Sequence, residues 1–184
     1  MTPLLFFILS FILSVGLTLL VRYLSLKFKI LDFPLSHSRK IHQTPIPLGG
    51  GVAIFLTFVI CLFISWQCGF WPSHHIELKH LAGMIFAGAI LMFGGFLDDR
   101  FHLKPVYQII WPILASLVVI MSGIGIEYIN NPFGSGYIYF NQIKIEVFHF
   151  KGIPYYFTPL ADIFTFIWLM VLAYSTKLLD GLDG

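Results

Sequence analysis

Five apolar stretches limit how this chain can fold more than any other feature of its sequence. They cover about residues 2–21, 48–67, 81–97, 106–124 and 161–179. A helix needs roughly 20 apolar residues to cross about 30 Å of hydrocarbon, and each stretch is close to that length. Hydrophobic residues make up 58% of the chain and charged residues only 11%, which excludes an ordinary water-soluble globular fold. We therefore expect an all-α polytopic membrane protein with about five transmembrane helices, forming a single integral-membrane domain over residues 1–184.

The distribution of Lys and Arg predicts how these spans are oriented. Segments 22–47 and 98–105, together with the end of the fifth span, carry eight of these residues, whereas segments 68–80 and 125–160 carry three. Basic residues favour the cytoplasmic side of a membrane. We therefore expect the N-terminus outside and the C-terminal end in the cytoplasm. The net charge of +2 is too small to indicate a nucleic-acid partner.

Residues 125–160 favour a small extracytoplasmic β-hairpin between the fourth and fifth spans. Turn-forming residues at 130–136 precede an aromatic and β-branched stretch from Tyr137 to Phe150, which is interrupted near Asn141 and Gln142. The aromatic side chains of this segment favour a membrane-interface belt over a binding cleft.

Three polar clusters follow the first, third and fifth spans, so the topology places all of them at one membrane surface, expected to be the cytoplasmic one. The clusters are Arg39, Lys40 and His42 in the first loop; Asp98 and Asp99; and Lys177, Asp180 and Asp183. Paired acids beside hydrocarbon need a cation or hydrogen-bond donors to compensate them. Basic side chains bind phosphates. Together they favour a phosphate-bearing substrate and a divalent metal such as Mg²⁺.

Each cluster alone also has an ordinary structural interpretation. Asp98 and Asp99 can cap the segment that follows them, residues 180–184 can form a turn that leaves the membrane, and basic loops commonly contact lipid headgroups. A non-catalytic membrane scaffold is therefore one alternative. A transporter is disfavoured because no charge lies in mid-span.

Three segments resemble the polyprenyl-phosphate N-acetylhexosamine-1-phosphate transferases, the WecA-like and MraY-like enzymes of glycosyltransferase family 4. Residues 39–50 resemble the family's first cytoplasmic loop, residues 94–101 its double-aspartate motif and residues 180–184 its third motif. The order and spacing of the three segments make the resemblance specific. Because the family continues well past the third motif, we expect this chain to be the N-terminal half of a longer transferase and to be inactive by itself.

The resemblance implies a reaction at the first membrane step of cell-envelope glycan synthesis. A polyprenyl phosphate attacks the β-phosphorus of a UDP-N-acetylhexosamine and releases UMP, with Mg²⁺ or Mn²⁺ as cofactor, at the cytoplasmic face of a bacterial plasma membrane. The family also allows a homodimer. The identity of the hexosamine and of the glycan stays open.

The resemblance also assigns roles to individual residues of this sequence. Asp98 and Asp99 match acids beside the lipid phosphate, whereas Asp180 and Asp183 match acids near the nucleotide-sugar and are the candidate metal ligands. The candidate substrate-binding residues are Arg39, Lys40, His42, Lys177 and Gln108.

Two positions depart from the family pattern. Lys177 replaces an asparagine that contacts Mg²⁺ in the family, and Gln108 replaces a common lysine. A protonated lysine cannot ligate a metal. We therefore hypothesise that the cation missing at Gln108 has moved to Lys177, so that both side chains face the same phosphates.

A CDP-alcohol phosphotransferase is the alternative enzyme class, because such enzymes also carry spaced Asp-Gly elements in a membrane. Its pattern continues with Ala-Arg and further aspartates along the same helical region. The Asp-Gly elements at residues 180–184 lack that pattern.

Overall fold

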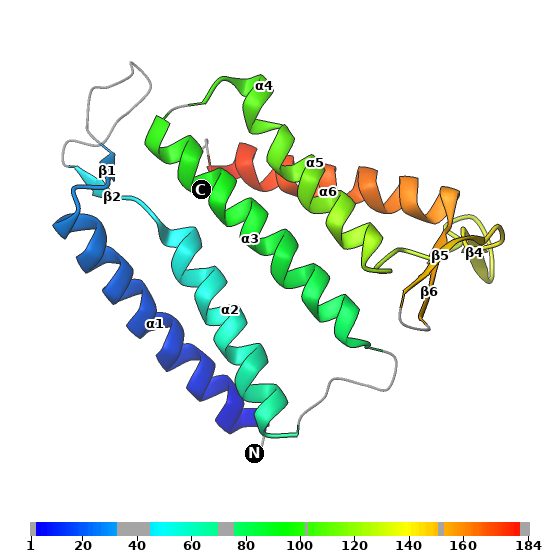
Figure 1. The fold of residues 1–184 in the computed structure, drawn as a ribbon, viewed down its shortest axis with the longest axis horizontal. Helices are drawn as coiled ribbons and strands as arrows, with labels where there is room; N and C mark the ends of the chain where they lie inside the picture. The colour runs from blue at the N-terminus through cyan, green and yellow to red at the C-terminus, as the bar shows by residue number, and fades with distance from the viewer. Residues whose placement is uncertain (1–2, 33–44, 70–75, 102, 151–152, 181–184) are drawn as a thin grey trace. The chain divides into compact units, whose positions relative to one another are not determined.

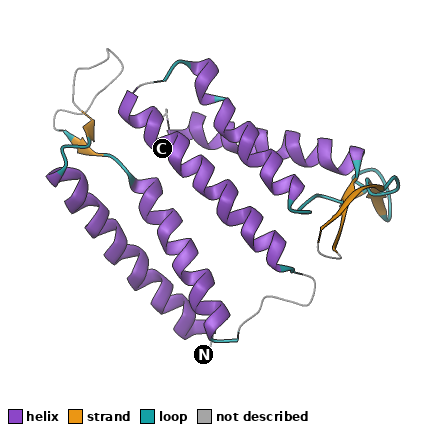
Figure 2. Ribbon diagram, viewed as in Figure 1, coloured by secondary structure: helices purple, strands orange, loops and turns teal. Residues whose placement is uncertain are grey.

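The structure, a computed structural model, describes residues 3–32, 45–69, 76–101, 103–150 and 153–180, and most of these residues are helical (Figures 1 and 2). The chain forms two compact units. Unit 1 comprises Met1–His74 and Met92–Pro105, and unit 2 comprises His75–Leu91 and Val106–Gly184. The expectation of a single membrane domain stays a prediction.

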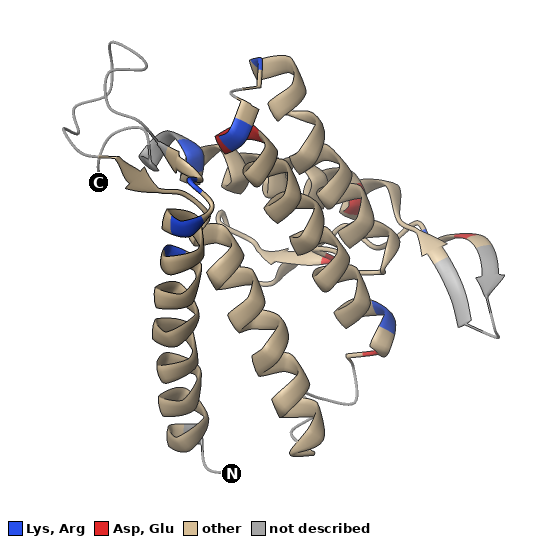
Figure 3. Cartoon of the chain, turned by 60° about the vertical axis from the view of Figure 1, so that its left-hand side comes forward, with Lys and Arg blue, Asp and Glu red and all other residues tan. Residues whose placement is uncertain are grey.

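Unit 1 is built mainly from two long apolar helices, α1 (Pro3–Lys27) and α2 (Gly50–Gln67), which pack against each other (Figure 1). Most large apolar side chains of α1 are exposed. A helix that is apolar on all sides and has little protein around it is typical of a membrane span. Its basic residues gather at the end that leads into the following loop, and the rest of the helix carries no charge (Figure 3).

The junction between α1 and α2 is fixed by specific contacts. Ser25, which is 4% exposed, donates from Oγ to the carbonyl oxygen of Leu48 at 2.6 Å. The two-residue strands β1 (Leu31–Asp32) and β2 (Ile46–Pro47) pair as antiparallel partners. Gly49 follows with a φ of +103°, and a Cβ there would lie 3.4 Å from Val21 Cγ1. Glycine therefore suits both the backbone conformation and the close approach of the two helices.

Unit 2 contains α5 (Ile110–Met121) packed against α6 (Pro159–Asp180). It also includes α3 (Leu78–Phe101) as far as Leu91 and the short α4 (Pro105–Gln108) from Val106 on. Gly83 of α3 lies against Ser122, which follows α5 directly. A Cβ at Gly83 would collide with Ser122 Cβ and Oγ. This absent side chain lets α3 approach the end of α5.

The predicted β-hairpin between α5 and α6 is confirmed, and the structure has two such hairpins there. β3 (Tyr128–Asn130) pairs with β4 (Tyr137–Tyr139), and β5 (Ile145–Phe150) pairs with β6 (Ile153–Phe157), both antiparallel. The predicted interruption near Asn141 separates β4 from β5. β4 and β5 do not pair with each other. Each pairs with a strand outside the stretch Tyr137–Phe150, because a short turn joins it to that antiparallel neighbour.

Two contacts attach the first hairpin to α6. The rings of Phe140 and Phe164 stack with centroids 4.8 Å apart. The backbone N–H of Ile126 donates to Thr165 Oγ at 2.8 Å, and Thr165 is 4% exposed. These contacts hold the segment after α5 on the side of α6.

Four helices are long and apolar enough to cross a membrane: Leu4–Lys27, Gly50–Gln67, Leu78–Phe101 and Pro159–Lys177. They correspond to the first, second, third and fifth predicted spans. The fourth predicted span, 106–124, is the shorter apolar segment Pro105–Met121. The expected polytopic helical fold is thus confirmed, while its orientation in the membrane stays a prediction.

The fourth segment is interrupted at Ile109, between α4 and α5. Pro112 has no backbone N–H, so it cannot donate to the carbonyl of Gln108 four residues earlier, and its ring crowds that carbonyl. The proline therefore explains why the regular helix begins again only at Ile110.

Candidate functional site

The paired aspartates lie near the C-terminal end of α3, at the level where this span ends. Asp98 is half-buried, and its Oδ1 accepts a hydrogen bond of 3.1 Å from the backbone N–H of Leu103. Asp99 is exposed. One carboxylate oxygen of Asp98 therefore has a structural role in the connection between α3 and α4.

Nearby glycine leaves space beside the two acids. Gly95 is one turn before Asp99, and a Cβ placed there would meet no atom within 4 Å. The backbone of α3 is thus open on that side, and a ligand group can approach it closely.

The most informative contact of the third cluster joins two residues that are far apart in sequence. Lys177, in the last turn of α6, donates from Nζ to Gln108 Oε1 of α4 at 2.5 Å. Both residues belong to unit 2. The hypothesis of a relocated cation places these two side chains at one site, and the structure has them in direct contact; their role toward phosphates stays a prediction.

Gln108 can orient Lys177 because an ammonium group donates three hydrogen bonds and an amide oxygen accepts them. Lys177 is exposed, so its charge reaches solvent beside the end of α6. The contact fixes one end of a long flexible side chain through a neutral amide oxygen.

Several predicted site residues lie outside the described part of the chain. Arg39, Lys40 and His42 fall within 33–44, and Asp183 falls within 181–184. Asp180 is the last residue of α6, but its side chain is not among those described. The roles of these residues stay predictions. The helix α6 extends to Asp180, the first residue of the third motif.

The described residues fit Mg²⁺ chemically without forming a closed metal site. Among them, no group of three or more His, Cys, Asp or Glu side chains could hold a metal ion. Mg²⁺ takes oxygen ligands and is commonly held by one or two protein carboxylates together with substrate phosphates. The carboxylates of Asp98 and Asp99 are donors of this kind, whereas the Lys177 ammonium is not.

Comparison with known proteins identifies the family. Residues 81–184 match the model of glycosyl transferase family 4, a region that includes both the paired aspartates and the third motif. The chain belongs to glycosyl transferase family 4. The resemblance noted from the sequence is thereby confirmed. No solved structure matches the chain.

Three curated relatives of this family 4 chain have names that describe the transfer of an N-acetylglucosamine phosphate. It is 25% identical to a probable undecaprenyl-phosphate N-acetylglucosaminyl 1-phosphate transferase of Bacillus subtilis (strain 168), over 97% of this chain and 42% of that protein. It is also 25% identical to the decaprenyl-phosphate N-acetylglucosaminephosphotransferase of Mycobacterium tuberculosis (strain ATCC 25618 / H37Rv), over 89% of this chain and 36% of that protein.

A third relative is the undecaprenyl-phosphate alpha-N-acetylglucosaminyl 1-phosphate transferase of Yersinia pestis, which is 22% identical over 95% of this chain and 40% of that protein. The family 4 chain therefore spans about two fifths of the length of these relatives.

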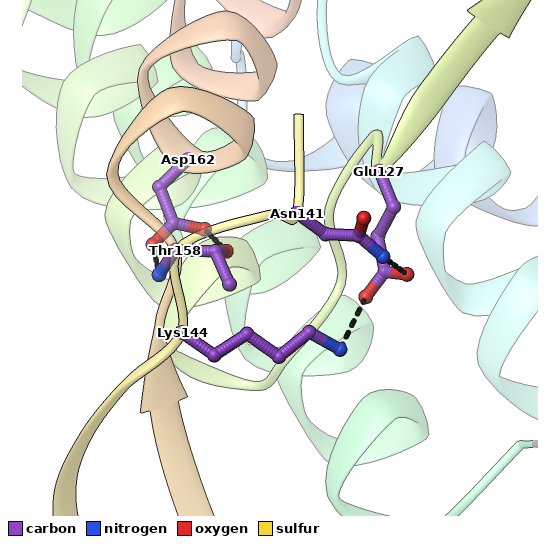
Figure 4. Close-up of polar contacts among 5 residues, drawn as sticks. All are labelled: Glu127, Asn141, Lys144, Thr158 and Asp162. Atoms are coloured by element: carbon purple, nitrogen blue, oxygen red, sulfur yellow. Dashed lines mark hydrogen bonds and ion pairs between the residues drawn. The ribbon is translucent and has the colours of Figure 1, made fainter. Parts of the chain in front are cut away.

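A second polar cluster, at the hairpin end of unit 2, is not evident from the sequence patterns. Glu127, Asn141, Lys144, Thr158 and Asp162 approach one another there from the loop after α5, the hairpins and the start of α6 (Figure 4). Only Asp162, an acid in the first turn of α6, leaves a sequence signal. Thr158 joins Asp162 through hydrogen bonds, and strand pairing brings Glu127, Asn141 and Lys144 together.

Proposed function

We propose that the complete protein transfers N-acetylglucosamine 1-phosphate from a UDP-sugar to a polyprenyl phosphate and releases UMP. The observation that carries this proposal is the family match over residues 81–184, which takes in Asp98, Asp99, Asp180 and Asp183. The names of the Bacillus and Yersinia relatives specify undecaprenyl phosphate and N-acetylglucosaminyl 1-phosphate transfer, which supports the choice of sugar and lipid carrier.

The reaction joins two anions, and this sets the main demand on the protein. An oxygen of the lipid phosphate forms a bond to the β-phosphorus of the UDP-sugar. The bond from that phosphorus to the bridging oxygen breaks, and the bridging oxygen leaves with UMP. Phosphoryl transfer of this kind is catalysed mainly by positioning and by neutralising charge. A general base is not required, because a lipid phosphate is largely ionised near neutral pH.

Lys177 supplies positive charge for this step in our proposal. Its ammonium donates to Gln108 Oε1 at 2.5 Å, and the side chain is exposed at the end of α6, where a phosphate oxygen can reach it. Arg39, Lys40 and His42 of the first cytoplasmic loop bind further phosphate oxygens in the same proposal. The acids Asp98 and Asp99 lie beside the lipid phosphate, and Asp180 and Asp183 beside the nucleotide-sugar.

Mg²⁺ is the proposed cofactor. When bound, it neutralises charge on the diphosphate as the bond to the leaving group breaks. Asp180 and Asp183 are the proposed ligands, and their carboxylate oxygens suit this ion. We place the site on the cytoplasmic face, because Lys and Arg are concentrated in the segments that adjoin it.

The test uses membranes that contain the complete protein, with UDP-N-acetylglucosamine, undecaprenyl phosphate and Mg²⁺. The measured quantities are UMP release and formation of the lipid-linked sugar. We expect both products in equal amounts, and loss of at least 100-fold in rate on Asp98→Asn or Asp99→Asn, about 2.7 kcal/mol of barrier. Asn keeps an Oδ1 acceptor for the Leu103 N–H, so Asp98→Asn tests charge rather than the structural bond.

Lys104→Gln is the matched control, because it removes an exposed charge from the same connection without touching the paired acids. It should leave the rate unchanged. The alternative of a non-catalytic scaffold rests on the Asp98 to Leu103 hydrogen bond. That alternative predicts no UMP release by the wild-type protein and normal folding of all three variants.

A further inference from the structure

The polar cluster at the hairpin end of unit 2 surrounds a small cavity of about 130 Å³. That is about the liquid volume of four water molecules. Sites for whole nucleotides and other drug-sized ligands are usually several times larger. The charged side chains on its walls are Lys79, Glu127, Lys144 and Asp162. The cavity can therefore take one small polar group, and its walls carry both signs of charge.

The walls of this cavity are held in place by short hydrogen bonds. Asn141 Nδ2 donates to Glu127 Oε2 at 2.6 Å. Thr158 donates from its backbone N to Asp162 Oδ2 at 2.8 Å and from Oγ to Asp162 Oδ1 at 3.0 Å. Figure 4 shows the two carboxylates, with Lys144 reaching toward Glu127. Since these groups are fixed by the fold itself, a ligand does not have to order them on binding.

The charges on the walls cancel, which decides the kind of ligand. Lys79 is mostly buried, with 20% of its side chain exposed, and its Nζ lies 3.0 Å from Glu77 Oε2. Lys144 Nζ lies 3.9 Å from Glu127 Oε1, too far for a hydrogen bond. A simple anion or a simple cation meets as much repulsion as attraction here. A ligand with both charges can place each one next to its opposite.

The cavity lies where lipid headgroups are expected. Thr158 directly precedes the apolar helix Pro159–Lys177 and Asp162 lies in its first turn, while Ile120 and Met121 at the end of α5 also line the cavity. The ends of membrane spans lie at the headgroup level. Apolar Ile120 and Met121 beside the charged groups suit a molecule that is polar at one end and apolar at the other.

We propose that this cavity binds the zwitterionic phosphate–amine headgroup of a lipid such as phosphatidylethanolamine. The phosphate lies toward Lys79 and Lys144, and the primary ammonium lies toward Glu127 and Asp162. A choline headgroup cannot donate hydrogen bonds to these carboxylates, and a glycerol headgroup lacks the cation, so both bind less tightly. This site is independent of the proposed transferase activity.

The test measures lipid retention by the complete protein. The protein is delipidated in detergent, mixed with equal amounts of phosphatidylethanolamine, phosphatidylcholine and phosphatidylglycerol of identical chains, and analysed by native mass spectrometry. We expect phosphatidylethanolamine to be retained about tenfold better than either competitor, which corresponds to about one decade in dissociation constant. Equal retention of the three lipids overturns the proposal.

Three variants assign the preference to this cavity. Lys144→Gln removes a contact to the phosphate that all three lipids share and should lower the retention of each, whereas Lys144→Arg keeps the charge and should keep the retention. Glu127→Gln retains an oxygen and should bring phosphatidylethanolamine down to the level of phosphatidylcholine. Lys104→Gln, in unit 1, should change nothing. A preference that survives Glu127→Gln, or an unchanged retention in Lys144→Gln, overturns the proposal, and melting temperatures of the variants confirm that they are folded.

Soluble O-phosphoethanolamine distinguishes two sources of this headgroup. If it displaces the lipid, the headgroup alone supplies the affinity, and the site accepts the free zwitterion as well. If only the intact lipid binds, Ile120 and Met121 contribute through the apolar part. Each result supports the zwitterion site and selects one of its two forms.

Discussion

Replacing Gly83 with alanine tests the closest packing contact of unit 2. The new Cβ would collide with Ser122 Cβ and Oγ and would lie 3.7 Å from Ser122 Cα. Ser122 cannot swing away easily, because its Cβ is attached to a backbone whose N–H is bonded to the carbonyl of Val118 at 3.0 Å. Relief of the collision therefore requires that α3 and the end of α5 move apart.

The size of the effect follows from two opposing contributions. Overpacking of a close contact costs about 1–3 kcal/mol. Collision with two atoms puts the cost in the upper part of that range, about 2–3 kcal/mol. Alanine in place of glycine inside a helix raises the free energy of unfolding by about 0.5–1 kcal/mol. The net loss in the free energy of unfolding is then about 1–2.5 kcal/mol, which for a chain of this size lowers the melting temperature by about 2–10 °C. Thermal unfolding of the purified protein in detergent measures it.

Two further variants make the result specific. Gly95→Ala lies in the same helix, and its Cβ would meet no atom within 4 Å, so its melting temperature should stay equal or rise slightly. Ser122→Gly in the Gly83→Ala background removes the atoms that collide and should restore most of the lost stability. The reasoning is refuted if Gly83→Ala melts like the wild type, or if its effect and that of Ser122→Gly simply add.

Three other outcomes are expected from contacts of the same structure. Ser25→Ala leaves the carbonyl of Leu48 without its 2.6 Å donor and should lower the free energy of unfolding by about 1 kcal/mol in chemical denaturation. Thr165→Val should cost about 1–3 kcal/mol, because a backbone N–H loses its acceptor, whereas Thr165→Ser should be nearly neutral; thermal unfolding compares the two. In UMP-release assays, Lys177→Asn and Gln108→Lys should each reduce the rate about tenfold or more, and the double exchange should recover activity if the cation can act from either position. Independent losses that multiply in the double exchange contradict the relocated cation.

The long apolar stretches make most of this fold predictable, since length and hydropathy alone identify a membrane helix. The apolar segment Pro105–Met121 is shorter and less regular than length and hydropathy suggest, because they do not weigh the hydrogen bond lost at Pro112. The hairpins show a second limit. Turn residues locate the ends of strands, but they do not say which neighbour each strand pairs with.

The candidate site also contains some contacts that the sequence predicts and others that it does not. Lys177 and Gln108 could be assigned to one site from sequence because each departs from a family pattern, and the structure has them in contact. The hydrogen bond from the backbone N–H of Leu103 to Asp98 could not be predicted, since a backbone donor carries no sequence signature. The cavity beside Lys144 was equally hidden, because its charges come from separate elements that meet only in three dimensions.

The attachment of the first hairpin to α6 has a consequence for how this family can diverge. Ile126 is bonded to Thr165 and Phe140 is stacked on Phe164, so both ends of the first hairpin are fixed to one helix. Lengthening a turn between fixed ends costs little, about 0.6 kcal/mol for each doubling of its length. Insertions at the exposed turn around Phe133 should therefore accumulate during evolution without disturbing the helices, and natural variation in chain length should concentrate there.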